Sequence, residues 1–394
     1  MAAKPSTPPL DDAEGIFEGG PPRRLTALAR LPSPLCPNAG VRLLLVIAIG
    51  WAPLALLVGL DVLSGRPQVL PTFVTDIGVH ARYAFAVPVL VLAHALCARR
   101  LGAIARHFLD SGLLSEDDQR RLVVALDAAR RRVRSLRAEA AVLVVAYLLV
   151  LQVVFFEGAA LRLSAWQTTP NGVDFSIAGW WHAVVSVPLL IIVLLGWGWR
   201  IGNWAWFLRE VAHLDLQLVA AHPDQAGGLG FLSQSVRAFG FVGLGIGGIV
   251  AGRFAFVHLH GLATIYTNGL LIGGTAAVVL LLAVGPLAVF VVPQARAWRQ
   301  GSFAYGSLAN QLGRQFERAW FTGKPRGSML SEPDFSAATD LYQLVANVYA
   351  MRFLPVDPRS IVILLTFTLA PFLPAALISV PASVILDEVK ALLF

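Results

Sequence analysis

Seven apolar runs dominate the pattern of hydrophobic and polar positions along the chain. A helix that crosses a membrane needs about 20 mostly apolar residues, and none of these runs has the polar stripe of an amphipathic surface helix. Outer-membrane strands would show alternating polarity over segments of about 10 residues, a pattern that is missing. The runs therefore predict an all-α, polytopic membrane protein with spans at 42–60, 83–98, 140–156, 182–199, 238–257, 268–293 and 361–385.

The basic residues between these runs predict the orientation of the spans. Cytoplasmic segments carry an excess of Lys and Arg, and with the N-terminus inside they hold 26 of the 31 Lys and Arg residues. Only Arg66, Arg82, Arg162, Arg253 and Lys390 fall in the spans or on the other side. Seven spans with the N-terminus inside place the C-terminus outside.

The pattern divides the chain into four parts. Residues 1–40 are rich in Pro and small residues and have no apolar core, so we expect a disordered cytoplasmic tail rather than a signal peptide. Residues 41–299 hold spans one to six, with cytoplasmic helical extensions at 101–139 and 200–237. Residues 300–358 form a cytoplasmic helical anchor segment, and residues 359–394 hold the seventh span and a short external C-terminus.

Composition agrees with this class and excludes others. The chain is 56% hydrophobic and 14% charged, with a mean hydropathy of +0.67, whereas soluble domains carry about 25% charged residues. The net charge of +7 is explained by topology and by attraction to anionic lipids; no basic module remains to bind nucleic acid. Cys36 and Cys97 both fall on the cytoplasmic side, where a disulfide is not expected, and no spacing predicts a metal site.

Three cytoplasmic segments have the spacing of amphipathic helices. Residues 113–137 open with Ser115 as an N-cap before acidic residues and carry a dense Arg face, which indicates a solvated helix or one that contacts lipid headgroups. Residues 302–321 and 334–354 form the other two, and the last is stopped by Pro355. These helices predict a shared stalk or an oligomer contact.

Motifs of enzymes are missing or lie in the wrong context. The run 243–248 (GLGIGG) matches a dinucleotide-binding pattern, but it lies inside an apolar helix rather than after a soluble strand. Its glycines are instead spaced to let another helix approach closely. We therefore expect neither an enzyme nor a cofactor.

A polar loop precedes the fifth span. The residues His222, Pro223 and Asp224 are followed by the glycines Gly227, Gly228 and Gly230. Pro223 ends one helix and the glycines permit a tight turn. The loop predicts a rigid cytoplasmic corner or, alternatively, a loop that senses an ion, a phosphate or another ligand.

Ionisable and aromatic side chains gather at the outer ends of the spans. Charged groups at membrane depth are costly unless they are paired or hydrated, and snorkelling to the interface is the simpler explanation. The functional alternative is an outer polar pocket for a small molecule or an ion, formed by Arg82, Trp181, His182, Arg253, His258, His260, Tyr266 and Asn268.

The last span is interrupted by hydroxyl residues and prolines. Hydroxyls on a helix kinked by proline suit the wall of a pore, and they also suit a packed helix whose hydroxyls bond its own carbonyls. The candidates for lining a pore are Thr366, Thr368, Ser379 and Ser383.

Several of these motifs together resemble a family of uncharacterised bacterial multi-pass inner-membrane proteins. They are the run 222–232 (HPDQAGGLGFL), Ala251-Gly252-Arg253, Tyr305-Gly306 with 316–320, and Asp340-Leu341 to Pro355. They cover most of residues 220–394 in the same order. The resemblance implies a bacterial inner membrane and no activity.

The architecture is similar, more loosely, to the seven-transmembrane insect chemoreceptor channels and their relatives. That similarity rests on the number and direction of the spans and on the cytoplasmic helices before the last span, not on any side chain. It implies a homo-oligomer in which cytoplasmic helices anchor the subunits and the last span lines a cation pore.

Three functions therefore remain open. The first is an oligomeric ion channel or channel-like ligand sensor. The second is a secondary transporter, which ranks lower because no internal repeat is recognised and seven spans divide unevenly. The third is a non-transporting scaffold or envelope-signalling protein.

Overall fold

The fold is that of a computed structural model, which describes residues 39–156, 164–171, 174–259, 265–321 and 333–379. These residues form helices and no strand; an isolated bridge pairs Thr168 with Phe175. The elements in chain order are α2 (Ala39–Gly50), α3 (Ala52–Leu63), α4 (Val69–Val74), α5 (Ile77–His80), η2 (Ala81–Ala86), α6 (Val87–Asp110), α7 (Glu116–Val133), α8 (Leu136–Phe156), α9 (Ile177–Trp181), η3 (His182–Ser186), α10 (Val187–Ala212), η4 (Gly230–Leu232), α11 (Ser233–Ala238), α12 (Gly240–Leu259), α13 (Ile265–Val284), η5 (Gly285–Phe290), α14 (Val291–Phe321), α15 (Pro333–Tyr349), α16 (Pro358–Leu369) and α17 (Phe372–Ser379).

Several helices have the length and apolar composition of membrane spans. Five continuous helices qualify, at Leu43–Leu63, Ile77–Asp110, Ile177–Ala212, Gly230–Leu259 and Asn268–Arg318, and α7 with α8 makes a sixth if their 40° bend lies within one span. Among the described residues the prediction of an all-α fold is confirmed, and five or six of the helices are long and apolar enough to cross a membrane. The seventh predicted span begins with α16, which is apolar but only 12 residues long, and residues 380–385 of that span lie outside the described residues.

Several helices run beyond the predicted spans. The helix that holds the second predicted span is 34 residues long, and the one that holds the fourth is 36. Residues 302–321 do not form a separate helix as predicted, because they continue span six within one helix of 51 residues. The helix predicted around 113–137 is confirmed as α7, whose N-cap Ser115 accepts a hydrogen bond from the Asp118 N–H.

The second and fourth spans are built alike, residue for residue, 100 positions apart. Each starts at a side-chain N-cap, Asp76 or Ser176. Each then passes through a π-helical segment, η2 or η3, immediately before a Val-Pro pair. A proline ring clashes with the carbonyl four residues earlier, and the wider π turn relieves that clash. Pro88 and Pro188 therefore explain both irregularities.

The likeness continues to the inner ends of these spans and reaches a third one. Residues 100–105 (RLGAIA), 200–205 (RIGNWA) and 299–304 (RQGSFA) share an Arg-x-Gly-x-x-Ala pattern. The arginines follow a proline by 12 residues at Pro88 and Pro188, and by 13 at Pro286, where η5 again interrupts the α-helix. The described residues thus contain three two-helix hairpins that share these breaks and this short pattern. The three hairpins share the positions of their helix breaks and ends but few identical residues, so the likeness is hard to recognise in the sequence alone.

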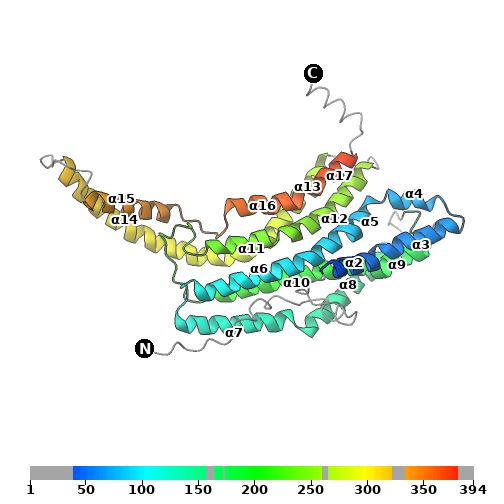
Figure 1. Ribbon diagram of the computed structural model, residues 1–394, viewed down its shortest axis with the longest axis horizontal. Coiled ribbons are helices and arrows are strands. Elements are labelled where there is room, and N and C mark those ends of the chain that lie inside the picture. Colours follow the sequence, from blue (N-terminus) through cyan, green and yellow to red (C-terminus); the bar gives the residue numbers. More distant parts are fainter. Residues whose placement is uncertain (1–38, 157–163, 172–173, 260–264, 322–332, 380–394) are drawn as a thin grey trace, which may run out of the picture.

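Each hairpin brings the chain back to the side it left, so the three have the same direction. Within them α2 contacts α6, α8 contacts α10, and α12 contacts α13. The second helices also meet, because α10 contacts both α6 and η5 (Figure 1). The helix α16, with the short α17 after it, stands outside this repeat.

Glycines let α12 lie unusually close to its neighbours. A Cβ on Gly243 or Gly247 would run into Thr368 of α16, and one on Gly248 or Gly252 would run into Phe85 or Ala81 of η2. The GLGIGG run is therefore a packing motif, as the sequence predicts. It fixes α16 against the third hairpin.

The C-terminal part of α14 leaves the bundle as an arm with α15 alongside it (Figure 1). At its base, Gly301 allows Ala220 to approach, and Trp298 packs edge-on against Phe353. Farther out, Phe303, Leu308 and Tyr342 are exposed. The arm thus offers an apolar surface that the described residues of this chain do not cover.

Candidate functional site

The polar loop before the fifth span contacts several segments that are far apart in the sequence, and we call it the hub. We call residues 222–230 the His-Pro-Asp loop. It lies between α10 and α11, and its neighbours come from α14 and from the segment that joins α15 to α16. The loop therefore links the arm of α14 and α15 to the start of α16.

The Asp224 carboxylate organises this loop from within. Its Oδ1 accepts hydrogen bonds from the N–H groups of Ala226 and Gly228 at 2.8 and 3.2 Å, and its Oδ2 accepts one from Gly230 at 2.8 Å. Gly227 and Gly228 adopt φ values of 64° and 97°, which favour glycine. The aspartate and the glycines together make one closed turn.

The contacts of the Asp224 carboxylate bear on the two predicted roles of the loop, a rigid corner or a ligand-sensing loop. Successive backbone N–H groups can form a nest for an anion, but here Asp224 already occupies it. Burial raises the pKa of Asp224, yet the bonds from Ala226, Gly230, Gly228 and His222 outweigh burial and hold that pKa below its usual value. The N–H groups of Ala226, Gly228 and Gly230 already have an acceptor within the loop, which favours the rigid corner over a phosphate site.

Arg352 fastens the loop to the segment before α16. Its guanidinium donates to the carbonyls of Asp224 and Val356 at 2.8 and 2.9 Å, and its backbone N–H donates to the Gln225 carbonyl at 2.7 Å. From α14, the buried Gln294 amide donates to the Ala226 carbonyl at 3.0 Å. The sequence did not single out either residue, because both contacts join segments far apart in the chain.

A second set of contacts holds the start of α16, and we call it the latch. Asp357 is the N-cap of α16, and its Oδ2 accepts from the Arg237 guanidinium of α11 at 2.6 Å. Arg237 Nε also donates to Ser360 Oγ at 2.7 Å, while the Asp357 N–H donates to Ser233 Oγ at 3.0 Å. Burial raises the pKa of Asp357, but the hydrogen bonds from Ser360 and Arg237 lower it by more. The pKa of Asp357 therefore lies below its usual value.

We expect the latch to weaken in acid. A carboxylate whose pKa is lowered by folding contributes stability at pH values above its unfolded pKa, and that contribution is lost as the pH falls. For Asp357 and Asp224 this predicts a loss of thermal stability below about pH 4. Thermal unfolding of the detergent-solubilised protein between pH 7 and 3 measures it.

The Asp357→Asn variant serves as the control for this prediction. It should be less stable than the wild type at pH 7, and the gap should narrow at pH 3.5, because the unfolded wild-type chain then binds a proton that the folded Asp357 carboxylate does not. A gap that stays constant over the whole range contradicts the assignment.

At the outer end, the structure brings His182 together with residues that the sequence did not single out. His182 Nε2 lies 3.2 Å from Tyr83 Oη, and its Nδ1 lies 3.3 Å from Gln167 Nε2. Trp166 packs edge-on against the same imidazole and donates to the buried Asp76 carboxylate at 3.2 Å. These contacts join the first two hairpins, since Asp76 and Tyr83 belong to one and His182 to the other.

The hydrogen bonds fix the protonation of His182. Gln167 Oε1 accepts from the Ser164 N–H, so Gln167 Nε2 faces the imidazole as a donor. Nδ1 must then accept, and the proton lies on Nε2, which donates to Tyr83. Both ring nitrogens of His182 therefore have partners within the protein.

The other members of the predicted outer pocket do not converge on one site. Trp181 Nε1 donates to the Ile49 carbonyl, and Arg82 Nε donates to the Gly78 carbonyl. His258 bonds the Phe254 carbonyl and the Asn268 amide at 2.9 and 3.3 Å. Arg253 is exposed, with its guanidinium 5.2 Å from the Phe256 ring centroid. His260 and the Tyr266 side chain lie outside the described residues.

The two threonines of the predicted pore wall have different surroundings. Each hydroxyl donates to the carbonyl four residues earlier, Thr366 to Val362 and Thr368 to Leu364. Thr368 is fully buried against α12, which excludes it from a pore wall in this fold, whereas Thr366 is exposed. Ser383 and the side chain of Ser379 lie outside the described residues.

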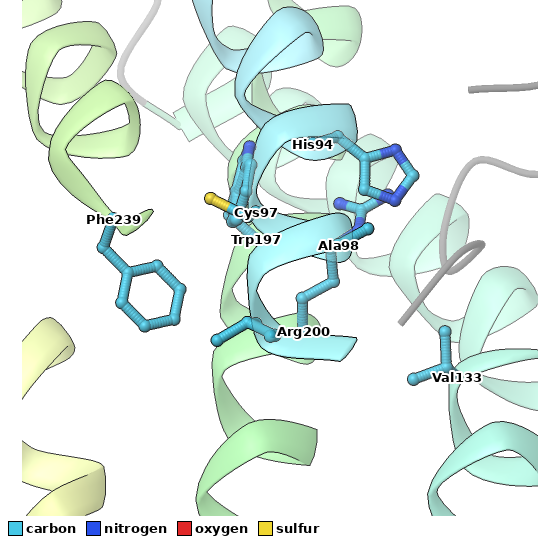
Figure 2. A pocket seen from close by; sticks show the side chains of 8 residues that line it. His94, Cys97, Ala98, Val133, Trp197, Arg200 and Phe239 are labelled. Carbon is cyan, nitrogen blue, oxygen red and sulfur yellow. The ribbon is translucent and has the colours of Figure 1, made fainter. Parts of the chain in front are cut away.

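A small cavity lies between the first two hairpins at the level of their inner ends (Figure 2). His94, Cys97 and Arg200 line it, and it has room for about one water molecule. The Arg200 guanidinium lies 5.5 Å from the Trp197 ring centroid, and Cys97 Sγ donates to the Ala238 carbonyl at 3.0 Å. The cavity is too small for a substrate.

No family model, curated protein or solved structure matches this chain. The residues themselves therefore carry the functional argument. No group of three or more His, Cys, Asp or Glu side chains is placed to hold a metal ion in the part of the chain that the structure describes. The best-defined polar assembly in that part is the hub with its latch, at the root of the last helix.

Proposed function

We propose that the protein is a subunit of an oligomeric ion channel, or channel-like ligand sensor, of the bacterial inner membrane. The observation that carries this proposal is the state of the last apolar helix. One face of α16 is packed on the glycines of α12, while Val362, Thr366 and, beyond the break at Pro371, Leu373 are exposed. A helix outside the repeat, fixed on one side and open on the other, suits a wall shared between subunits.

The distribution of charge supports seven passes with the N-terminus inside. Arginines stand at the same end of all three hairpins: Arg42, Arg137 and Arg237 at their starts, and Arg100, Arg200 and Arg299 at their returns. Arg359 stands at the start of α16. By the excess of basic residues on the cytoplasmic side, this end is inside, and α16 then leads outwards.

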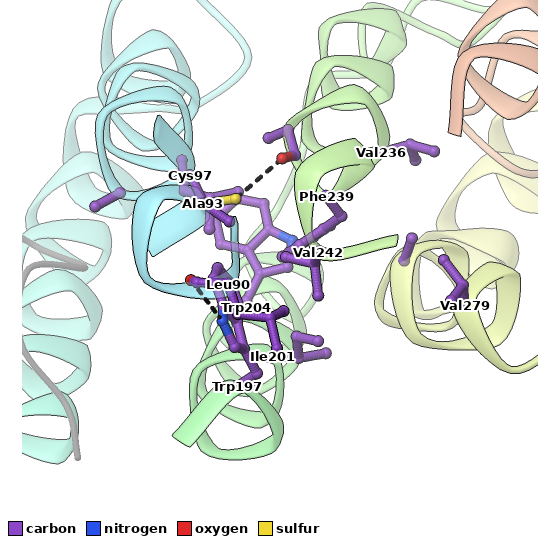
Figure 3. Packing of buried hydrophobic residues seen from close by; sticks show 14 of the residues in the cluster. Leu90, Ala93, Cys97, Trp197, Ile201, Trp204, Val236, Phe239, Val242 and Val279 are labelled. Carbon is purple, nitrogen blue, oxygen red and sulfur yellow. Dashed lines mark hydrogen bonds between the residues drawn. The ribbon is translucent and has the colours of Figure 1, made fainter. Parts of the chain in front are cut away.

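The interior of the bundle supports a path between subunits rather than through one. Where α6, α10 and α12 meet, Leu90, Trp197, Ile201, Trp204 and Phe239 are buried together (Figure 3). Trp197 Nε1 donates to the Leu90 carbonyl at 3.1 Å, which ties two hairpins across this core. Ions crossing here would have to displace large apolar side chains, so the core is a seal.

The arm of α14 and α15 supports assembly. Phe303 is 75% and Tyr349 60% exposed, and apolar surface of this kind on a cytoplasmic extension marks an interaction site. We assign it to contacts between subunits. The hub then connects this contact to α16, through Gln294 on one side and Arg352 with Asp357 on the other.

The experiment combines native mass spectrometry with ion flux into liposomes. The wild type should be an oligomer and should release a potassium gradient. The Phe303→Ser/Leu308→Ser variant should shift to monomer and lose flux, whereas Val124→Ser, at an exposed apolar residue of α7, should change neither. A monomeric wild type, or a monomeric variant with undiminished flux, contradicts the proposal.

The repeat favours one alternative, a secondary transporter. Many transporters contain repeats, including parallel ones related by an axis along the membrane normal. This alternative predicts uptake of a substrate against its gradient by the monomer, with no unitary currents. The liposome experiment separates the two, since the Phe303→Ser/Leu308→Ser variant would then keep its activity.

A further inference from the structure

The arginines of α7 and the start of α8 differ in what they contact. Four are paired with carboxylates: Arg120 with Asp117 at 2.6 Å, Arg121 with Asp118 at 3.4 Å, Arg130 with Asp127 at 3.5 Å and Arg132 with Glu210 at 3.0 Å. Arg131, Arg134 and Arg137 are exposed. Their guanidinium groups make no ion pair or hydrogen bond with the residues that the structure describes. Within that part of the chain, the charge of these three arginines is not neutralised by a carboxylate.

Charge is also segregated along α7. Its first turn holds Glu116, Asp117 and Asp118, and its last turn holds Arg130, Arg131 and Arg132. The three unpaired arginines follow one another at three-residue intervals across the bend between α7 and α8. We call Arg131, Arg134 and Arg137 the corner triad.

The corner triad lies where the chain enters the membrane. Val133 lines the same cavity as Ala98 and Arg200, so the bend is level with the inner ends predicted from the sequence for spans two and four, at residues 98 and 199. Beyond it α8 turns apolar side chains outwards, with Val144 58% and Leu148 56% exposed. Leu136, between Arg134 and Arg137, is also exposed.

This position selects the partner. A guanidinium binds phosphate oxygens through two parallel hydrogen bonds, and basic residues beside a membrane are attracted to anionic lipid on the cytoplasmic leaflet. An exposed leucine among them suits the acyl region just below the headgroups. A soluble phosphate would meet the arginines but would leave the leucine in water.

We propose that the corner triad, with Leu136, binds the phosphate headgroup of an anionic phospholipid of the inner leaflet. The lipid completes the bend between α7 and α8 and fixes the level of α8 in the bilayer. The site does not depend on whether the protein conducts ions.

The experiment measures lipid binding to the full-length protein. Arg131→Gln/Arg134→Gln/Arg137→Gln removes the triad, and Arg120→Gln/Arg121→Gln/Arg130→Gln is the matched control, which removes the same charge from paired arginines of the same helix. Each protein is exchanged into nanodiscs that contain equal phosphatidylglycerol and phosphatidylcholine, and retained lipids are counted by native mass spectrometry. In detergent, short-chain phosphatidylglycerol, short-chain phosphatidylcholine and inorganic phosphate are each titrated while the melting temperature is followed.

The wild type and the control should retain phosphatidylglycerol over phosphatidylcholine and should be stabilised by the short-chain anionic lipid alone. The triad variant should need about tenfold or more of that lipid for the same stabilisation. Equal losses in the triad variant and the control would overturn the proposal, as would stabilisation by inorganic phosphate at the same concentrations.

A variant that keeps the charge guards against misfolding. Arg131→Lys/Arg134→Lys/Arg137→Lys retains the attraction but not the planar fork, so it should fall between the wild type and the Gln variant. If the Gln variant does not fold, the Lys variant and the single change Arg134→Gln decide the question. Affinity in both that equals the wild type's would again overturn the proposal.

Discussion

Replacing Asp224 by alanine will destabilise the protein markedly, because it removes the acceptor of three backbone hydrogen bonds. The change leaves the N–H groups of Ala226, Gly228 and Gly230 without their acceptor. A buried donor left unsatisfied costs about 1–3 kcal/mol, and partial access of water to this half-buried site reduces the sum. We expect a loss of about 2–4 kcal/mol in the free energy of unfolding, seen as a lower melting temperature in detergent.

The consequence should reach the last helix, because the loop carries Arg352 and through it the segment before α16. A cysteine at Val356, which is buried in the native fold, should therefore react faster with a thiol reagent in the Asp224→Ala background. Asp215→Ala is the control, since Asp215 is an exposed aspartate of the same connection. If the control is as unstable as Asp224→Ala, the carboxylate is not the organiser of the loop.

Replacing Gly247 by valine will separate α16 from α12. A Cβ at Gly247 would collide with the backbone carbonyl of Thr368, and a backbone atom cannot move aside as a flexible side chain can. Overpacking of this kind costs about 3 kcal/mol and here acts on one helix pair. We expect loss of ion flux together with increased labelling of a cysteine at Thr368, which is fully buried in the native packing.

The matched control is Gly198→Val on α10, because no atom lies within 4 Å of a Cβ built there. It should retain both flux and the protection of Thr368. Protection that persists in Gly247→Val would mean that the two helices do not depend on this close approach.

The helical elements could be predicted from sequence because apolar run length is a local property. Six predicted spans lie within helices that the structure shows. The N-cap of α7 at Ser115 could be predicted from that serine and the acidic residues after it. The lengths of spans two and four were underestimated, since a helix continues past the membrane wherever its next turns can pack. Pro371 predicts a break in the last span. The packing of α16 against α12 could not be predicted from the sequence.

The sites were less predictable, for a physical reason. The turn around Asp224 is closed by its own residues, so a tight turn could be predicted from its sequence. Arg352, Gln294 and the latch join positions more than 60 residues apart, and nothing local distinguishes them. The described members of the outer pocket have separate partners, because shared depth in the membrane does not place side chains on facing helices.

The most direct test of the account is a planar-bilayer recording with a cysteine at Thr366, in a background with Cys36 and Cys97 replaced by serine. The proposal predicts unitary currents that a charged thiol reagent reduces in Thr366→Cys and leaves unchanged in Thr368→Cys, which is buried against α12. An active channel that is blocked at position 368 and not at 366, or a correctly folded oligomer that passes no current, would contradict it.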